Sequence, residues 1–487
     1  MSPNEFEAHR VAKLRDLQSL GVDPYGARFP DAMPIAQVLA SFQEESPCRV
    51  RAAGRISLMR AMGKATFAHI KDRTGSVQVF FQLDRLGEEA FRIQGLLELG
   101  DLVGVEGELR KTRTGEITIF VDSLQVLAKA LLSPPEKWHG LRDSEIRYRR
   151  RYVDLFANQE VLDCFMLRFR LMDALRSFLS ERGFLEVETP MMQAVPGGAA
   201  AKPFITHHNT LDMDLYLRVA PELYLKRLLV GGLERVFEVG RNFRNEGIDR
   251  QHNPEFTSVE VYQAYADYTD MMALAESLVR HLAAQVDAGA VLPFGEHMID
   301  YASPFRRVSY AGAFEEANGF PMSDRKRVLA RAAEMGLEAG ALDYSILVDR
   351  IFEASVEEKI VQPTFIMDYP SAICPLTRPK AEDPDVAERW DLLIAGMEIG
   401  PAYSELSDPQ LQQEKFCQQL KGLDEEEATM RTVDADFIRA LAYGMPPAGG
   451  MGLGIDRLVM LMANKPGIRE VILFPLLRPE EGDGAEG

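Results

Sequence analysis

The side chains best suited to chemistry are concentrated in residues 235–268, RVFEVGRNFRNEGIDRQHNPEFTSVEVYQAYADY. The pattern predicts a strand, an irregular loop and a second strand. The loop carries charged and amide groups, Arg244, Glu246, Arg250, His252 and Asn253. In the second strand, alternation places four side chains on one face about 20 Å long, Phe256, Ser258, Glu260 and Tyr262. This face suits an extended ligand with a flat ring and a cationic tail, although a hairpin with a polar, solvent-exposed face would show the same pattern.

A glycine-rich strand followed by a helix is predicted at residues 445–464, MPPAGGMGLGIDRLVMLMAN. The strand contains Gly449, Gly450, Gly452 and Gly454. Glycine weakens a strand unless another backbone or a ligand must approach closely. Arg457 falls in the first helical turn, where backbone N–H groups favour anions, and its planar guanidinium matches phosphate oxygens. The segment is therefore a candidate phosphate site, while tight packing would explain the glycines equally well.

A third candidate segment, residues 389–408, contains three acidic residues spaced by seven: Asp391, Glu398 and Glu405. Oxygen ligands of this kind suit Mg²⁺ that bridges nucleotide phosphates. Because seven is odd, a straight strand would send the first two to opposite faces, so we expect a bulge near Ala395-Gly396 if both face one site. The alternative is a set of exposed acids in an acidic protein.

Other chemistries find little support in the sequence. It has neither a GxSxG nucleophile motif nor a GxxxxGK[ST] phosphate loop, and adjacent histidines at His207-His208 would point apart on a strand. The cysteines form no CxxC pair, which argues against a zinc ribbon or a disulfide scaffold and fits a reducing cytoplasm. They are Cys48, Cys164, Cys374 and Cys417.

The elements that would position these groups divide the chain into parts. We expect an N-terminal helical extension at 1–48 and five short strands with a helix near 85–98 within 49–132, which suits an OB-type barrel that binds single-stranded nucleic acid. Strand count alone leaves other small barrels possible. Residues 133–151 read as a linker or as the start of a solvated helix.

The remainder, 152–487, is predicted to be one large α+β domain with a helical insertion at about 271–345. Helices and strands do not alternate regularly there, which argues against a parallel doubly wound sheet.

Charge and composition agree with a soluble enzyme of several domains. The chain has 487 residues and a formal charge of -19, yet residues 51–151 contain 18 Lys and Arg against 13 Asp and Glu, or +5. A basic module on an acidic body can hold a polyanion, although the split could arise by chance. The charged N-terminus and the lack of an 18-residue apolar run predict neither export nor membrane insertion, and hence a cytoplasmic protein.

In this order, the segments resemble a class II aminoacyl-tRNA synthetase of the lysyl type over nearly the whole chain. FLSERGFLEVETPMM (178–192), FEVGRNFRNEGIDRQHNPEFTSVEVY (237–262) and GMGLGIDRL (450–458) are similar to the three class motifs. PGGAAAKPFITHHN (196–209) and APELYLKRL (220–228) are similar to the lysyl subgroup. The resemblance implies an α+β fold, with an antiparallel sheet flanked by helices and an N-terminal OB-fold barrel.

The resemblance also implies roles for individual residues. Arg244 would hold the amino-acid carboxylate and the α-phosphate of ATP, and Arg457 the γ-phosphate. Glu246, His252 and Asn253 would contact ATP, and Phe256 would stack on adenine. Mg²⁺ would be held by Asp391 and Glu398. The lysine pocket would comprise Gly198, Glu222, Glu260, Tyr262, Tyr403 and Glu405. A U-rich anticodon would be read by Phe67, Gln78 and Glu116.

The implied reaction joins L-lysine to ATP as lysyl-adenylate, with release of pyrophosphate, and then transfers lysine to the terminal adenosine of tRNA(Lys). A homodimer is implied as well. Three positions depart from the family pattern: Pro401 replaces a usual asparagine, Ala372 a common glutamate, and Asp391 a frequent glutamate. A related ligase that lysylates a protein, and a non-catalytic RNA-binding or regulatory paralogue, are the alternatives.

Overall fold

The computed structural model describes residues 7–26, 28–46, 48–135, 143–199, 201–286, 289–337, 343–419 and 433–479. The chain forms two compact units, residues 1–162 and 163–487. The expected catalytic domain starts eleven residues earlier than the second unit, and 136–142 of the expected linker lie outside the described residues. The division at 151 therefore stays a prediction.

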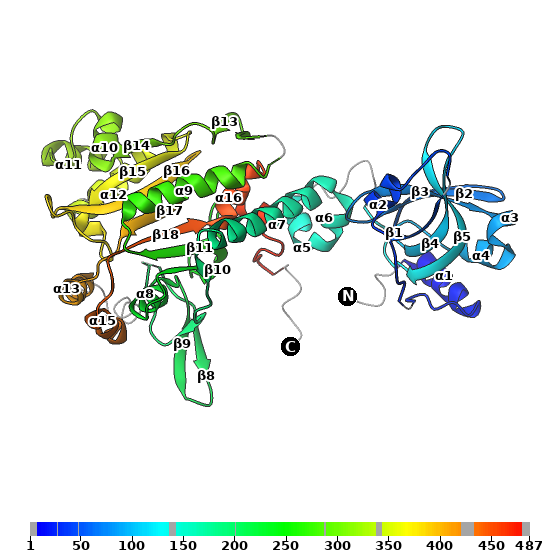
Figure 1. Ribbon diagram of the computed structural model, residues 1–487, viewed down its shortest axis with the longest axis horizontal. Coiled ribbons are helices and arrows are strands. Elements are labelled where there is room, and N and C mark those ends of the chain that lie inside the picture. The colour runs from blue at the N-terminus through cyan, green and yellow to red at the C-terminus, as the bar shows by residue number, and fades with distance from the viewer. Residues whose placement is uncertain are drawn as a thin grey trace. The chain divides into compact units, whose positions relative to one another are not determined.

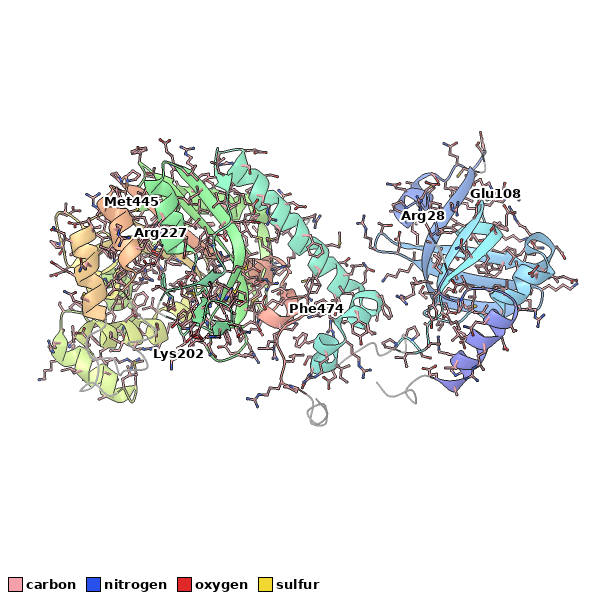
Figure 2. The ribbon with its side chains drawn as sticks, turned by 90° about the horizontal axis from the view of Figure 1, so that it is seen from below. Arg28, Glu108, Lys202, Arg227, Met445 and Phe474 are labelled. Atoms are coloured by element: carbon pink, nitrogen blue, oxygen red, sulfur yellow. The ribbon has the colours of Figure 1, made fainter. Side chains whose placement is uncertain are left out.

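The first unit contains a closed five-stranded barrel in the order β1-β2-β3-β5-β4 (Figure 1). Its strands are β1 (Cys48–Met62), β2 (Ala65–Lys71), β3 (Ser76–Gln82), β4 (Leu102–Lys111) and β5 (Ile117–Ala128). Burial alternates along β2 and β3, so every second side chain enters the barrel core and the others face outward. This confirms the predicted barrel. On its surface Glu108, labelled in Figure 2, pairs with Arg85 and Arg110.

Short helices accompany the barrel. The expected helix near 85–98 is two shorter ones, because Gly87 at φ 86° interrupts it. The helices of this unit are α1 (Ala8–Ser19), α2 (Ile35–Ala40), α3 (Leu83–Leu86), α4 (Glu88–Gln94), α5 (Ser144–Arg149) and α6 (Arg151–Ala157), followed by α7 (Gln159–Ser180), which continues into the second unit.

The second unit is built on an eight-stranded sheet in the order β14-β15-β16-β17-β18-β11-β10-β6. Neighbours are antiparallel except for the two outermost pairs, β14 with β15 and β10 with β6. Its strands are β6 (Leu185–Glu186), β10 (Arg235–Phe243), β11 (Glu255–Ala264), β14 (Arg306–Ser309), β15 (Thr364–Pro370), β16 (Val386–Ile394), β17 (Met397–Ser404) and β18 (Ala448–Gly454). The mixed helices and largely antiparallel sheet confirm the α+β class.

One face of this sheet is covered by helices. Apolar side chains of α7, α9 (Tyr268–Ala283) and α16 (Ile455–Met462) form a single buried cluster with Val259, Val261 and Met451 of the sheet. Figure 1 shows α9 lying along the strands of the sheet. Because side chains alternate along a strand, the intervening residues point to the opposite face.

The described residues cover the opposite face only in part. Over β15 and β16 it packs against α10 (Tyr310–Asn318), α11 (Arg325–Glu334) and α12 (Tyr344–Ser355). Over β17, β18, β11 and β10 it lines a cavity, described below. The segment 271–345 differs from the expected helical insertion, because α9 belongs to the sheet core and β14 to the sheet itself. It also contains the hairpin β12 (Val291–Phe294) and β13 (His297–Asp300).

Smaller elements complete the second unit. A three-stranded sheet contains β7 (Met192–Gln193), β9 (Met213–Leu217) and β8 (Ile205–His208). Apolar residues of α8 (Glu222–Val230) pack against α15 (Ala435–Ala442) and Met445, and Arg227 of α8 donates to Asp434 at 2.7 Å (Figure 2 labels Arg227 and Met445). Within the described part of this unit, the remaining helices are α13 (Pro409–Gln419), α17 (Ile468–Val471) and the 3₁₀ turns Glu357–Lys359 and Ser371–Ile373. In the described part of the chain, no helix combines the length and apolarity needed to cross a bilayer.

The bulge expected near Ala395-Gly396 is wrong. These residues form the two-residue turn between β16 and β17, with φ of 52° and 71°. Across such a hairpin Leu393 pairs with Glu398, so Asp391 and Glu398 share a face although their spacing is odd. A bulge does occur, but further on, where Leu392 pairs with Gly400 and Ile399 becomes the extra residue.

Candidate active site

A cavity of about 300 Å³ opens on the uncovered face of the large sheet. Most of the site residues predicted from the sequence line it: Gly198, Glu222, Arg244, Glu246, His252, Asn253, Phe256, Glu260, Tyr262, Glu398, Tyr403 and Arg457. The face of β11 predicted from alternation is included in full, because Ser258 also lines the cavity. Among the described residues, the cavity lining does not include Asp391 or Glu405.

Arg244 occupies one end of this cavity beside an aromatic ring. Its guanidinium carbon lies 5.1 Å from the centre of the Phe256 ring, and its backbone N–H donates to the Pro254 carbonyl at 2.8 Å. The buried Nε of Arg244 has no hydrogen-bond partner among the described residues, and the same holds for Oδ1 of Asn253 and of Asn242. Buried polar groups are seldom left unpaired. A polar, anionic ligand would complete this end of the site.

Arg457 is held by two neighbours at the start of α16. It donates to the carbonyl oxygen of Glu398 and lies 3.1 Å from Nε2 of His252. Nδ1 of His252 lies 2.8 Å from Oδ2 of Asp249. With Nδ1 donating to that carboxylate, Nε2 is left to accept from the guanidinium. His252 therefore orients Arg457 as well as lining the cavity.

The other part of the cavity is lined by carboxylates and phenols. Glu222, the first residue of α8, accepts a hydrogen bond from the Tyr403 hydroxyl at 2.8 Å. Tyr262 donates to Glu260 at 3.3 Å. Burial, and next the charge of Glu222, raise the pKa of Glu260 to about 8. A buried cation would be strongly favoured here, because it would relieve both effects.

Glu405 lies behind this wall and contacts a residue that sequence reasoning missed. The Nζ of Lys226 is fully buried, 2.7 Å from Oε1 of Glu222 and in contact with Oε2 of Glu405. The i, i+4 spacing of Glu222 and Lys226 was visible, but such pairs are common on exposed helix surfaces. Asn242 was also missed, although alternation along β10 could have pointed to it.

One side of the cavity is lined by Gly198 and Ala199, which belong to the loop residues described at 196–199 and 201–202. Gly198 has φ 91°, a conformation that favours glycine, and an added Cβ would lie 3.2 Å from the Cβ of Ala220. The carbonyl of Lys202, labelled in Figure 2, accepts from the backbone N–H of Asn245 at 2.7 Å. This bond ties the loop to the Arg244 segment. Pro401 also lines the cavity, so the departure from the family pattern lies in the site itself.

The candidate Mg²⁺ ligands are close to other charged groups. Both oxygens of Asp391 accept from Arg389, at 2.8 and 2.7 Å, whereas Glu398 lines the cavity. Burial is the main cause that raises the pKa of Glu357 to about 8, and the charges of Glu398 and Asp391 add to it. The electrostatic potential near these two carboxylates is therefore negative. No three acidic, His or Cys residues in the described ranges are arranged to hold a metal ion by themselves. These residues could hold Mg²⁺ only if phosphate oxygens of a bound nucleotide supplied further ligands.

The three residues predicted to read an anticodon lie on the outer face of the barrel. The Phe67 and Phe80 rings are 4.4 Å apart. Gln78 donates to Oε2 of Glu116 at 2.7 Å, and Nε2 of His69, which was not predicted, lies 2.8 Å from Oε1 of the same carboxylate. Thr118 donates to Oε1 of Gln78 at 2.7 Å and so fixes the orientation of its amide. The face thus presents stacking surfaces beside a fixed hydrogen-bonding group.

Comparison with known proteins agrees with this geometry. Residues 143–478 match the family described as tRNA synthetases class II (D, K and N), and residues 50–127 match the OB-fold nucleic acid binding domain. A lysine–tRNA ligase of Pelotomaculum thermopropionicum is 50% identical over 98% of this chain and 96% of its own length. The chain belongs to the lysine–tRNA ligases of class II. A protein of the same name from Carboxydothermus hydrogenoformans is 47% identical over 98% of this chain and 99% of its own length. Another, from Syntrophomonas wolfei, is 48% identical over 99% of this chain and 98% of its own length.

The family membership confirms several predictions made from the sequence. The resemblance to lysyl-type class II synthetases, the fold, and the activity of a lysyl-tRNA synthetase are all supported.

Proposed function

We propose that this lysine–tRNA ligase activates L-lysine with ATP and Mg²⁺ in the described cavity and then transfers lysine to tRNA(Lys). The observation that carries this proposal is the arrangement of charges. Arg244 and Arg457 line the same cavity as the carboxylates of Glu222 and Glu260. One substrate with a cationic side chain and another with phosphates would satisfy both sets of groups.

The first step needs no base from the protein. The lysine carboxylate is already a nucleophile; it attacks the α-phosphorus of ATP, an acyl-phosphate bond forms, and pyrophosphate leaves with the electrons of the broken P–O bond. Arg244 would neutralise charge at the α-phosphate and Arg457, oriented by His252, at the γ-phosphate. Phe256 would stack on adenine, while Glu246, His252 and Asn253 would contact ATP. Mg²⁺ would supply charge neutralisation between phosphates, held by Glu398 and, once released from Arg389, Asp391.

Selection of lysine follows from the cost of burying a cation. Glu222, Glu260 or Glu405 would pair with the side-chain ammonium group of the substrate, with Tyr262 and Tyr403 beside it. Gly198 would bring the loop backbone close. An amino acid of similar size without the charge would leave the carboxylates uncompensated and be rejected.

The proposal is tested by ATP–pyrophosphate exchange with each of the twenty amino acids in the absence of tRNA. We expect exchange with lysine alone. Exchange with aspartate or asparagine instead, or with no amino acid, would contradict it. Charging of tRNA would then separate this enzyme from a ligase that lysylates proteins.

Lysine affinity should depend on pH through Glu260. At neutral pH its raised pKa of about 8 keeps the carboxyl largely protonated in the empty cavity, and only the ionised form pairs with an ammonium group. The KM for lysine should therefore fall as the pH rises from 6 to 8 and then level off. In a Glu260→Gln variant the KM should be higher and nearly independent of pH over this range. A wild-type KM that is constant from pH 6 to 8 would rule out this role.

The outer barrel face should matter for the second step alone. Replacing Phe67 by leucine keeps an apolar side chain but removes the stacking surface, which should lower kcat/KM for tRNA charging about 10- to 100-fold. Glu116→Gln should reduce discrimination between uridine and cytidine in the anticodon. ATP–pyrophosphate exchange should stay within about twofold in both variants, because it takes place without tRNA. An equal loss in both assays would argue against the anticodon role.

Three further predictions remain proposals. A homodimer is supported by exposed apolar side chains around the first class motif, Leu185, Met191 and Met192; light scattering should give twice the chain mass. We also propose a cytoplasmic location. Finally, we propose the domain division expected from the sequence: a helical extension at 1–48, an anticodon-binding domain at 49–132, a linker at 133–151 and a catalytic domain at 152–487.

A further inference from the structure

A buried arginine lies next to the cavity and takes no part in the reaction described above. Arg218 directly follows β9, and only 1% of its surface is exposed. Its Nε donates to the carbonyl oxygen of Arg241 at 2.9 Å, and its Nη1 donates to Oγ1 of Thr189 at 3.2 Å and to Oε1 of Glu238. Its Nη2 is buried without a hydrogen-bond partner among the described residues. The guanidinium is therefore anchored on one side and still able to donate on the other.

The missing side chain of Gly240 lets this guanidinium approach β11. An added Cβ at Gly240 would overlap Nη2 of Arg218. Residues directly opposite each other on paired strands point their side chains to the same face. Across β10 and β11, Gly240 pairs with Ser258, and the next pair on this face is Glu238 with Glu260. The ion pair of Arg218 and Glu238 therefore lies beside the carboxyl group of Glu260.

The charge of Arg218 opposes the other influences on Glu260. Burial contributes most to its pKa of about 8, the charge of Glu222 comes next, and the charge of Glu238 adds to both. The hydrogen bond from Tyr262 and the charge of Arg218 lower this pKa. The titratable and charged groups that face Glu260 are Arg218, Glu222, Glu238, Tyr262, Tyr403 and Glu405. Arg218 thus supplies a positive charge beside Glu260 before any ligand enters the cavity.

An ammonium group of the substrate pairs with Glu260 only when this carboxyl group is ionised. We propose that Arg218 is a positioning residue for lysine binding, whose anchored guanidinium stabilises the ionised form of Glu260. The described lining of the cavity does not include Arg218, so it acts through Glu260 rather than on the substrate. The inference rests on the proposed function, since it assigns the cavity to lysine. It also accounts for Gly240, because a side chain there would displace the guanidinium.

The test compares E238Q with R218M/E238Q, so that removal of the arginine leaves no buried anion without its partner. The KM for lysine is measured by ATP–pyrophosphate exchange between pH 6 and 9. At pH 7, R218M/E238Q should have a KM about tenfold above that of E238Q, and its KM should level off at a pH about one unit higher. The KM for ATP should stay within about threefold, because the change acts on the carboxylate that binds lysine.

A Glu260→Gln background provides the matched control. It lacks the carboxyl group through which Arg218 acts, so adding R218M to E238Q/E260Q should change the KM for lysine less than about twofold. A loss as large as that seen with Glu260 present would mean that R218M disturbs the cavity in general, and would overturn the proposal.

E238Q alone tests the same interaction in the opposite direction. It removes an anion beside Glu260 and leaves Arg218 in place, so its KM for lysine should level off about half a pH unit below that of wild type. An unchanged pH profile in E238Q, or equal KM values in E238Q and R218M/E238Q, would overturn the proposal. If R218M/E238Q does not fold, as judged by circular dichroism, the profile of E238Q decides. Failure of the wild type to activate lysine would instead refute the proposed function.

Discussion

An Arg244→Gln variant is expected to activate lysine with a kcat/KM about 1,000-fold below that of the wild type. The guanidinium lines the cavity beside Phe256, and its buried Nε has no partner among the described residues, so it is free to bind an anion. Glutamine keeps a donor but loses the charge that would neutralise the pentacovalent α-phosphate. Loss of one such preorganised donor lowers rates by about 10²- to 10³-fold, and loss of the charge adds to it. Lysine-dependent ATP–pyrophosphate exchange measures the effect.

Arg241→Gln is the matched control, because Arg241 lies three residues earlier, pairs with Glu255 at 3.7 Å and is partly exposed outside the cavity. Its exchange rate should stay within about twofold of wild type, in line with a weak surface ion pair. If both variants lost activity to the same extent, the effect would come from folding of the loop, and the catalytic role of Arg244 would be refuted.

The second large effect is expected from Gly450→Ala. A Cβ at this position would overlap Oε1 of Glu405 and lie 2.5 Å from Cε1 of Tyr262. Both neighbours are buried, and Glu405 is held by Lys226, so neither can move without breaking other contacts. Overpacking of this kind costs about 1–3 kcal/mol, so kcat/KM for lysine should fall up to about 100-fold, mostly through KM.

Gly452→Ala provides a graded comparison on the same strand. An added Cβ there would lie 3.5 Å from Cγ of Glu260, which is an ordinary van der Waals contact. The fold-loss in kcat/KM for lysine should therefore be at least tenfold smaller in Gly452→Ala than in Gly450→Ala. Equal losses in the two alanine variants would mean that strand flexibility, rather than the space beside Glu405, explains the glycines. Thermal unfolding of both proteins would identify a general loss of stability.

Local patterns in the sequence were sufficient for features that depend on one strand or one turn. Period-two alternation placed Phe256, Ser258, Glu260 and Tyr262 on one face, and all four line the cavity. Arg457 was predicted in the first turn of a helix, and α16 begins at Ile455. The five barrel strands were also predicted from alternation and turn residues. In each case the decisive interaction lies within a few residues.

Features that depend on distant contacts could not be predicted in this way. Nothing in Glu222-x-x-x-Lys226 distinguishes an exposed helical pair from one buried against Glu405, which lies 179 positions later than Lys226. The turn at Ala395-Gly396 was misread as a bulge, because odd spacing was interpreted along one strand rather than across two. The real bulge lies next to Gly400, where an added Cβ would overlap the carbonyl oxygen of Gly452 on β18, a distant contact that the local sequence does not reveal.

That bulge has a consequence for how this stretch of chain can evolve. Before Ile399 the even-numbered Glu398 faces the cavity, and after it the odd-numbered Pro401 and Tyr403 do, while Ala402 packs into the core. The extra residue therefore reverses which side chains of β17 face the cavity and which face the core. Deleting it would send Tyr403 into the core and Ala402 into the cavity, exchanging the whole downstream set at once. A substitution in this segment alters one side chain, whereas the loss of one residue reverses the facing of every side chain that follows it on β17.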